Sequence, residues 1–307
     1  MGTPDFAAGI LTQILNAEYE VAGVVTVADK PAGRGQKLHE SAVKLLAQEK
    51  GLPILQPTNL KDETFLQELK NLNANLFVIV AFRMLPKQVW QMPELGTFNL
   101  HASLLPQYRG AAPINWTIIN GETETGVSTF FIDDKIDTGE IILQDKTPIS
   151  DNENAGSLHD RLMEMGGQTV IKTLELIANQ QVQTVQQPEN ADLKTAYKLN
   201  KENCKINWQQ NAKTIHNQIR GLSPYPAAWC FIKDQELEWN VKIYESEIIT
   251  ENHTLPAGTI ITDKNSLKVA VNDGFINIKN IQFPGKKRMP AKDLLNGVQF
   301  SENALAY

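Results

Sequence analysis

The amino-acid sequence predicts an α/β protein, with a doubly wound, mostly parallel sheet followed by a small β-barrel. Val21–Val27 and Leu76–Phe82 are almost continuously apolar, as strands covered on both faces are, and helix-like stretches separate them. After residue 203 the pattern changes to short strand-like runs with turn residues between them, which is typical of a small barrel. Two domains are therefore expected, 1–179 and 204–307, joined by a Gln-rich linker, 180–203.

Composition restricts the classes of partner. The chain has 307 residues, of which 42% are hydrophobic, enough for two buried cores. Its formal charge of −6 argues against a generic nucleic-acid binder. Residues 1–190 carry 14 Lys and Arg against 23 Asp and Glu, whereas residues 191–307 carry 15 against 12. The second half therefore tolerates an anionic partner better, although chance accounts for an asymmetry of this size equally well.

The chain begins with a turn, Met1–Phe6, that caps a helix over Ala7–Leu15. A strand–helix unit needs a strand before this turn, and we expect Met1 to be an internal methionine of a longer natural product, with a slot left in the sheet. Two apolar strands, a shorter strand and two helices follow: Val21–Val27, Ser41–Glu49, Ile54–Gln56, Asp62–Leu69 and Leu76–Phe82. The segment Ala28–Leu38, with three cations and two glycines, has the composition of a solvated loop.

Thr97–His101 alternates apolar and polar residues, which suits a short strand. Pro113 then opens a helix, Ile114–Asn120, and Gly121 ends it. The remaining expected elements are two strands and a long helix in the first domain, and a helix and five strands in the second: Val127–Ile132, Ile141–Leu143, Leu158–Ala178, Lys213–Arg220, Trp229–Ile232, Val241–Glu247, Gly258–Thr262, Leu267–Val271 and Phe275–Phe283.

Asn99 and His101 make the strongest chemical signal. Side chains on a strand repeat every second residue, so these two point to one face, about 7 Å apart. An amide NH₂ and an imidazole together suit the stabilisation of a developing oxyanion. The carboxyl end of a strand before a helix is also where doubly wound sheets place their active sites. A carboxylate is needed to orient the imidazole, and from the residues alone Asp133, Asp134 and Asp137 are all candidates.

These residues carry a resemblance to a known family. The pattern Asn99-x-His101-x-Ser103-Leu104-Leu105-Pro106-x-x-Arg109-Gly110 resembles the signature of the folate-dependent formyltransferases, and Arg109–Ile114 is similar to the branch that acts on methionyl-tRNA. The resemblance extends over nearly the whole chain. It implies a formyltransferase-type Rossmann-like domain, a barrel of the oligonucleotide-binding type, and transfer of a formyl group from 10-formyltetrahydrofolate to the α-amino group of methionyl-initiator tRNA. It also selects Asp137, in Ile136-Asp137-Thr138-Gly139, as the third catalytic residue beside Asn99 and His101.

The resemblance further implies binding residues. Arg83-Met84-Leu85, with Phe82, is similar to the folate-contacting segment of the glycinamide ribonucleotide relatives, and Ser103, Leu104, Leu105 and Pro106 complete the expected folate site. The loop with Arg34 and Lys37 resembles the one that tRNA formyltransferases insert to reach the acceptor stem. Lys286, Lys287 and Arg288, a basic run that by itself reads as a solvated turn, are the expected RNA contacts in the barrel, together with Lys205 and Arg220.

Two other functions fit parts of the sequence. A formyltransferase acting on an amino-sugar nucleotide shares much of Asn115–Gly126, and a non-catalytic RNA-binding protein would keep the fold but not the intact Asn99, His101 and Asp137. No phosphate-binding loop, dinucleotide motif or metal-ligand cluster is present in the sequence. With two cysteines in no metal spacing, no membrane-length apolar run and no signal peptide, we expect a cytoplasmic protein with inert thiols. We also expect a monomer that has no membrane partner.

Overall fold

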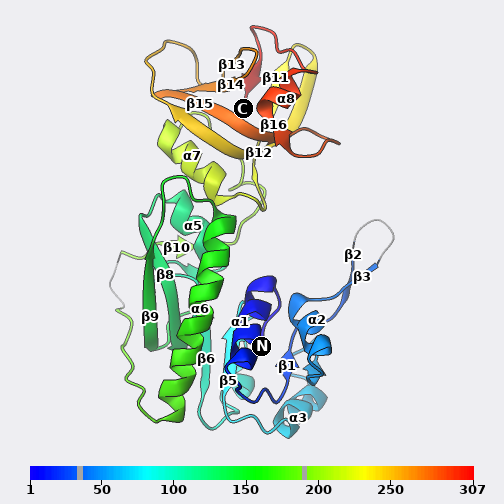
Figure 1. Cartoon of the computed structure of the whole chain (residues 1–307), viewed down its shortest axis with the longest axis vertical. Coiled ribbons are helices and arrows are strands. Elements are labelled where there is room, and N and C mark those ends of the chain that lie inside the picture. Colours follow the sequence, from blue (N-terminus) through cyan, green and yellow to red (C-terminus); the bar gives the residue numbers. More distant parts are fainter. Residues whose placement is uncertain (33–36, 189–191) are drawn as a thin grey trace. The chain divides into compact units, whose positions relative to one another are not determined.

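The computed structural model describes residues 1–32, 37–188 and 192–307, except for the side chains of Pro31, Ala32 and Lys37. The chain forms two compact units whose segments alternate along the sequence (Figure 1). Unit 1 consists of Met1–Gly110, Thr125–Thr147 and His159–Thr195, and unit 2 of Ala111–Glu124, Pro148–Leu158 and Ala196–Tyr307.

The sheet of unit 1 is mostly parallel, which confirms the predicted fold class. Strands β1 (Val24–Val25) and β4 (Ile54–Leu55) pair in parallel, and so do β5 (Phe77–Val80) and β6 (Thr97–His101). Beyond β6 lies β8 (Glu124–Phe131), which is antiparallel to it, and then β9 (Ile141–Pro148). The ordered strands are shorter than the apolar runs that predicted them, Val21–Val27 above all.

Met1 and Gly2 lie between β1 and β5. The Gly2 N–H donates to the Val25 carbonyl (3.1 Å), the Val80 N–H donates to the Met1 carbonyl (3.0 Å), and Gly2 forms a parallel bridge with Val80. This is the place in the sheet where the sequence predicts a slot. Two residues, rather than a strand of ordinary length, therefore join the two parallel pairs.

Helices and two short ladders complete unit 1. Helices α2 (Ala42–Glu49) and α3 (Glu63–Asn71) start where Ser41 and Asp62 accept backbone N–H bonds from residues three positions on, as N-cap side chains do. The other elements are helices, a hairpin and a pair of short strands: α1 (Asp5–Asn16), α4 (Lys87–Trp90), α6 (Ala155–Ala178), β2 (Lys30–Ala32), β3 (Lys37–His39), β7 (Arg109–Gly110) and β10 (Thr195–Ala196).

Helix α6 covers one face of β6 (Figure 1). A Cβ atom on Gly166 of this helix would lie 2.8 Å from the Leu100 side chain, so the close approach of helix and strand depends on glycine. Since Leu100 faces α6, its neighbours Asn99 and His101 face the other side of the sheet. The packing of α6 thus leaves one face of β6 for polar side chains.

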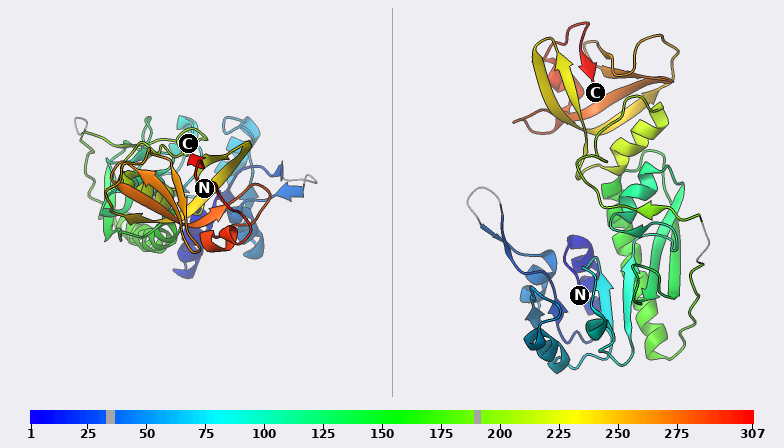
Figure 2. Two further views of the ribbon diagram at one scale, coloured as in Figure 1. Left: turned by 90° about the horizontal axis from the view of Figure 1, so that it is seen from above. Right: turned by 180° about the vertical axis from the view of Figure 1, so that it is seen from behind.

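Unit 2 contains the predicted barrel. Its strands pair in the order β13, β14, β15, β12, β11, β17, all antiparallel, and the Thr259–Leu305 bridge joins the two ends of this path. Figure 2 shows the curled sheet in yellow to red from two directions. The strands and the surrounding elements are β11 (Ala228–Asp234), β12 (Leu237–Ile249), β13 (Ile260–Thr262), β14 (Leu267–Val271), β15 (Gly274–Gln282), β16 (Met289–Pro290), β17 (Leu305–Ala306), α5 (Pro113–Ile119), α7 (Ala212–Gly221) and α8 (Ala291–Leu295).

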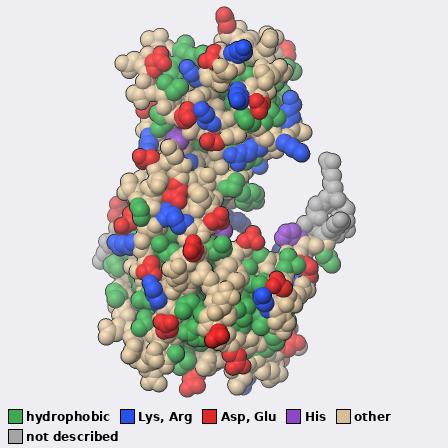
Figure 3. Space-filling model, in the orientation of Figure 1, with side chains coloured by type: hydrophobic (Ala, Val, Ile, Leu, Met, Phe, Trp, Pro, Cys, Tyr) green, Lys and Arg blue, Asp and Glu red, His purple; other side chains and the backbone are tan. Residues whose placement is uncertain are grey.

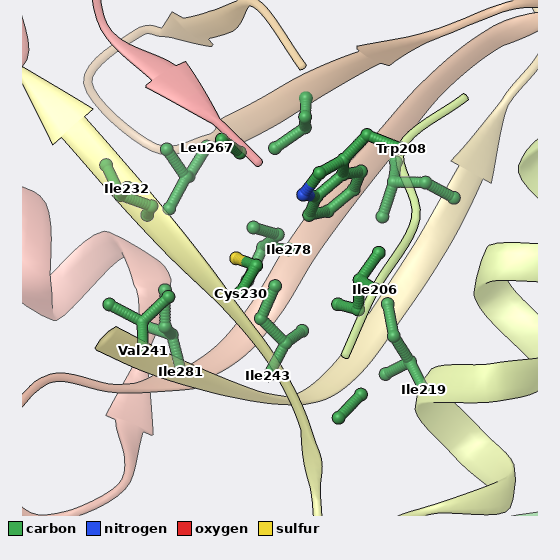
Figure 4. Packing of buried hydrophobic residues seen from close by; sticks show 14 of the residues in the cluster. Ile206, Trp208, Ile219, Cys230, Ile232, Val241, Ile243, Leu267, Ile278 and Ile281 are labelled. Carbon is green, nitrogen blue, oxygen red and sulfur yellow. The ribbon is translucent and has the colours of Figure 1, made fainter. Parts of the chain in front are cut away.

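The barrel is filled by side chains from all of its strands and from α7 (Figure 4). Trp208, Cys230 and Cys204 lie inside this core and are nearly inaccessible to solvent. Burial raises the pKa of the Cys230 thiol from its ordinary 9.0 to about 12, so this thiol stays protonated at neutral pH. Within the described part of the chain, no helix has the length and apolar character that crossing a membrane requires.

Candidate active site

Strand β6 presents Asn99 and His101 on the face opposite α6, as the alternation of the sequence predicts. The Asn99 side chain is half-buried, and no hydrogen bond joins it to another described residue. Its amide is therefore available to a ligand on this face. His101 is buried, with 6% of its surface exposed, at the carboxyl end of the strand.

The two nitrogens of the His101 ring face different groups. Nε2 lies 2.8 Å from the Tyr108 carbonyl oxygen, which only accepts hydrogen bonds, so Nε2 carries a proton and donates it there. Nδ1 lies 3.8 Å from Oδ2 of Asp137, which is too far for a direct hydrogen bond. Since Nε2 carries the proton of the neutral ring, Nδ1 is the nitrogen that bears the lone pair.

Three non-glycine residues around this face have left-handed backbone conformations. Ala81 follows β5, Tyr108 bears the carbonyl that binds His101, and Asp137 bears the carboxylate; their φ angles are 46°, 61° and 54°. Such conformations persist where surrounding contacts over-determine them, often at functional sites. At Asp137 one such contact is the N–H of Gly110, which donates to Oδ2 over 2.9 Å.

The turn after β6 is held by side chains of β8 and β9, of which Ser128 is buried and Gln144 is exposed. Ser128, directly opposite His101 in the ladder, accepts the Leu105 N–H (3.1 Å) and donates to the Ser103 carbonyl (2.6 Å). Gln144 donates to the Leu105 carbonyl (2.9 Å) and to Ser128 Oγ (2.8 Å). Ser103 and Leu105 are buried, while Leu104 and Pro106 are half-buried. These contacts fix the segment that the sequence assigns to folate.

The second expected folate segment follows β5, the parallel neighbour of β6. Phe82 is half-buried and Leu85 is buried, whereas 66% of the Met84 surface is exposed. The Arg83 guanidinium donates to the carbonyls of Pro57 and Thr58 and lies 5.7 Å from the Phe82 ring centroid. Both segments that are expected to bind folate therefore follow the carboxyl ends of adjacent parallel strands in unit 1.

The structure describes only some of the residues expected to bind RNA. Lys286, Lys287 and Arg288 are exposed in the turn between β15 and β16, and the Arg288 guanidinium lies 4.7 Å from the Tyr244 ring centroid. Arg34 and the Lys37 side chain lie outside the described residues.

The expectation that Arg220 contacts RNA is wrong. Its guanidinium is buried and donates to the carbonyls of Ser150 and Glu153, so it is not available to a phosphate.

Some residues of the site carry no signal in the sequence. Ser128 and Gln144 are ordinary strand residues there, and Gln187 lies in the predicted linker, yet its side chain bonds to the Asp137 carbonyl. The groups that they hold are distant in the sequence, which is why composition and periodicity do not reveal them.

The Asn99 amide, the buried His101 and the Asp137 carboxylate lie near the carboxyl end of a parallel strand, and groups of these types can stabilise an oxyanion and move one proton, which is the chemistry of acyl transfer. No cluster of metal-ligating side chains accompanies them among the described residues.

Comparisons with known proteins identify which acyl transfer this is. The sequence pattern of the formyl transferase family matches residues 1–174, and that of the formyl transferase C-terminal domain matches residues 198–299. The chain belongs to the formyl transferase family.

The matches to individual relatives extend over at least nine tenths of the chain. A methionyl-tRNA formyltransferase of Flavobacterium johnsoniae is 62% identical over 307 residues, covering 100% of this chain and 98% of the relative. That of Bacteroides thetaiotaomicron is 53% identical, covering 98% and 95%. Among solved structures, a sugar 3N-formyl transferase with dTDP and 5-N-formyl-THF has a TM-score of 0.64 and 25% identity, over 93% of this chain and 97% of that one.

Proposed function

We propose that this protein transfers the formyl group of 10-formyltetrahydrofolate to the α-amino group of methionyl-initiator tRNA, for the initiation of translation. The observation that carries the chemistry is the placement of Asn99, His101 and Asp137 at the carboxyl end of β6. Full-length similarity to proteins named methionyl-tRNA formyltransferase supports the choice of substrate.

In this proposal the amino group attacks the formyl carbon, and the carbonyl oxygen becomes an oxyanion. Asn99 donates a hydrogen bond to it from its free amide, a contribution of about 3–4 kcal/mol for a well-placed donor. His101 takes up the proton of the attacking nitrogen at Nδ1 and delivers it to the leaving nitrogen of tetrahydrofolate. Asp137, 3.8 Å away, stabilises the charged imidazole between these two steps.

The co-substrate is assigned to the two segments that follow β5 and β6. Phe82, Met84, Leu104 and Pro106 keep accessible apolar surface, against which a folate ring system can pack. Arg83, Leu85, Ser103 and Leu105 complete the proposed site; Leu85, Ser103 and Leu105 are buried and shape it through the backbone. The sugar formyl transferase of similar fold, solved with a formyl-folate, supports this class of co-substrate.

The RNA is assigned to basic residues of both units: Arg34 and Lys37 in the Met1–Gly110 segment of unit 1, and Lys286, Lys287 and Arg288 in the barrel of unit 2. Lys201, Lys242 and Trp229 add a pocket of about 350 Å³ on unit 2 that combines ammonium groups with an indole ring. Such a combination suits phosphates and unpaired bases. Over the surface drawn in Figure 3, Lys and Arg are interspersed with Asp and Glu, so local clusters rather than the net charge would bind the RNA.

Formyl transfer to an amino-sugar nucleotide is the second candidate, because a sugar formyl transferase shares the fold over nearly the whole chain. The decisive experiment offers the purified protein 10-formyltetrahydrofolate with either charged initiator tRNA or an amino-sugar nucleotide. We expect turnover with the tRNA and none with the sugar. Turnover with the sugar alone would reverse the assignment, and binding of RNA without turnover of either would indicate a non-catalytic protein.

We further propose that the protein works as a monomer in the cytoplasm, where its tRNA substrate is charged. Light scattering of the purified chain is expected to give the mass of one 34.2 kDa chain. A dimer mass that persists on dilution would contradict this.

A further inference from the structure

Gln187 joins two backbone segments of the candidate site. Its Nε2 donates to the carbonyl oxygens of Asp137 (3.0 Å) and Gly139 (2.7 Å). Its Oε1 accepts from Nε (3.0 Å) and Nη2 (2.6 Å) of Arg109. The side chain is buried, with 9% of its surface exposed, although it lies in a Gln-rich stretch whose other glutamines are exposed.

These contacts use the full capacity of the amide group. A glutamine offers two N–H donors and an oxygen with two lone pairs, and all four are occupied. The orientation is also unambiguous, because a flipped amide would place its NH₂ against a guanidinium and its oxygen against two carbonyls. Gln187 thus has one low-energy arrangement in this setting.

The two segments that Gln187 ties together meet at the Asp137 carboxylate. On one side, Asp137 itself has a left-handed φ of 54°, and Gly139 packs so closely that a Cβ there would lie 1.6 Å from the Phe131 carbonyl oxygen. On the other side, Gly110, the neighbour of Arg109, donates its N–H to Asp137 Oδ2 over 2.9 Å. A shift of either segment would therefore move the carboxylate relative to His101.

We propose that Gln187 is a positioning residue for the reaction. Its hydrogen bonds hold the Asp137 loop, Asp137–Glu140, in a fixed position relative to the Arg109–Gly110 segment, so that the Asp137 carboxylate stays beside His101 Nδ1. Arg109, part of the motif that resembles the family signature, contributes to the same arrangement by donating to Gln187. The part of this inference that concerns turnover rests on the proposed function. The part that concerns the loop does not.

The proposed effect of Gln187 on the Asp137 loop can be measured without any substrate. Gln187→Met keeps the length of the side chain but removes all four hydrogen bonds, Gln187→Glu keeps the acceptor for Arg109 but loses both donors, and Gln186→Met changes the exposed neighbour as a matched control. Hydrogen exchange of peptides that contain Gly110 and Asp137–Glu140 is expected to accelerate about tenfold or more in both Gln187 variants. Exchange equal to that of Gln186→Met would overturn the proposal.

Turnover provides the second measurement. Misplacement of a catalytic group by about 1 Å can lower a rate on the order of a hundredfold, so kcat is expected to fall by between ten- and a hundredfold in both Gln187 variants, with the KM for folate nearly unchanged. If Gln187 acts through Asp137, adding Gln187→Met to Asp137→Ala should cause little further loss. Multiplicative losses would show that Gln187 acts elsewhere.

The outcomes separate this inference from the function. A wild-type chain that formylates no acceptor would refute the proposed function, while the exchange measurement would still decide the role of Gln187. Gln187→Met could loosen the loop simply because the variant folds poorly. Gln187→Glu controls for this, since it keeps the acceptor for the two hydrogen bonds from Arg109 and loses only the two donors. If Gln187→Met alone loosens the loop, the Arg109 half of the arrangement is sufficient and the proposed role of the two donors is refuted.

Discussion

At the scale of single residues, the candidate site combines a side chain whose hydrogen bond is already formed without substrate with one whose amide has no partner in the described part of the chain. The His101 Nε2 donates to a backbone carbonyl, so the ring is fixed before substrate arrives, while the Asn99 amide has no partner among the described residues. Preorganised and unengaged groups of this kind are what transition-state stabilisation requires, because no reorganisation is needed at the moment of reaction.

His101→Ala and Asn99→Ala are each expected to lower kcat roughly a hundredfold or more, because each removes a group that acts on the developing charge. Thermal unfolding should change little for Asn99→Ala, whose side chain is only half-buried. His159→Ala, a partly exposed histidine of α6, is the matched control and is expected to keep its activity. Near-normal turnover in either site variant would refute the assignment.

The cysteines are expected to behave as core residues. With the folded pKa of Cys230 at about 12 and its ordinary value at 9.0, the contribution of this thiol to stability is complete below pH 9 and is lost as pH rises toward 12. A thiol reagent at pH 8 should label neither Cys204 nor Cys230 in the folded protein, and both once denaturant is added. Rapid labelling of the folded protein would contradict this.

At the scale of elements, the Asp137 loop approaches β8 so closely at Gly139 that a substitution there should lower the free energy of unfolding. Gly139→Ala would place a Cβ 1.6 Å from the Phe131 carbonyl oxygen, and the backbone has to move. We expect a loss of about 3 kcal/mol or more in the free energy of unfolding, measured with urea, together with a loss of turnover. Gly297→Ala, where the nearest atom is 4.0 Å away, is the control and should change neither.

The turn after β6 gives a second prediction at this scale. Ser128→Ala removes a fully buried hydroxyl and leaves the Leu105 N–H and the Ser103 carbonyl without that partner. A loss of about 1–3 kcal/mol in the free energy of unfolding is expected, with a weaker affinity for folate because the turn is loosened. Ser157→Ala, on an exposed stretch of α6, serves as control. Unchanged folate affinity would show that the turn after β6 does not contribute to binding of the co-substrate.

The elements also show what periodicity can and cannot predict. The alternation of Thr97–His101 predicted the strand and the shared face of its polar pair, because local spacing alone determines both. The apolar run Val21–Val27 yielded an ordered strand of only two residues, since strand length depends on partners elsewhere in the chain. Gln187 could not be predicted, because the groups that it binds lie 48 to 78 residues away.

At the scale of the whole molecule, the proposed catalytic groups and the two proposed folate segments all belong to unit 1, whereas the proposed RNA-binding residues are divided between the units. This assignment of roles to the two units comes from the resemblance of motifs and stays a prediction. The boundaries 1–179, 180–203 and 204–307 stay a prediction. Segments of the two units alternate along the chain, and sequence composition does not record such alternation.

The last prediction follows from this division. Arg34→Ala and Lys37→Ala are expected to weaken the use of tRNA while folate affinity stays unchanged, because phosphate binding and the folate segments involve different residues. For each phosphate that the variant no longer neutralises, the slope of log kcat/KM for tRNA against log salt should become shallower by about one.

Replacing Lys286, Lys287 and Arg288 one at a time by Ala tests the barrel in the same way. Lys61→Ala, which changes a lysine of unit 1 outside the proposed RNA-binding residues, is the control. If folate affinity falls along with tRNA use in the Arg34 and Lys37 variants, the loop belongs to the co-substrate site instead.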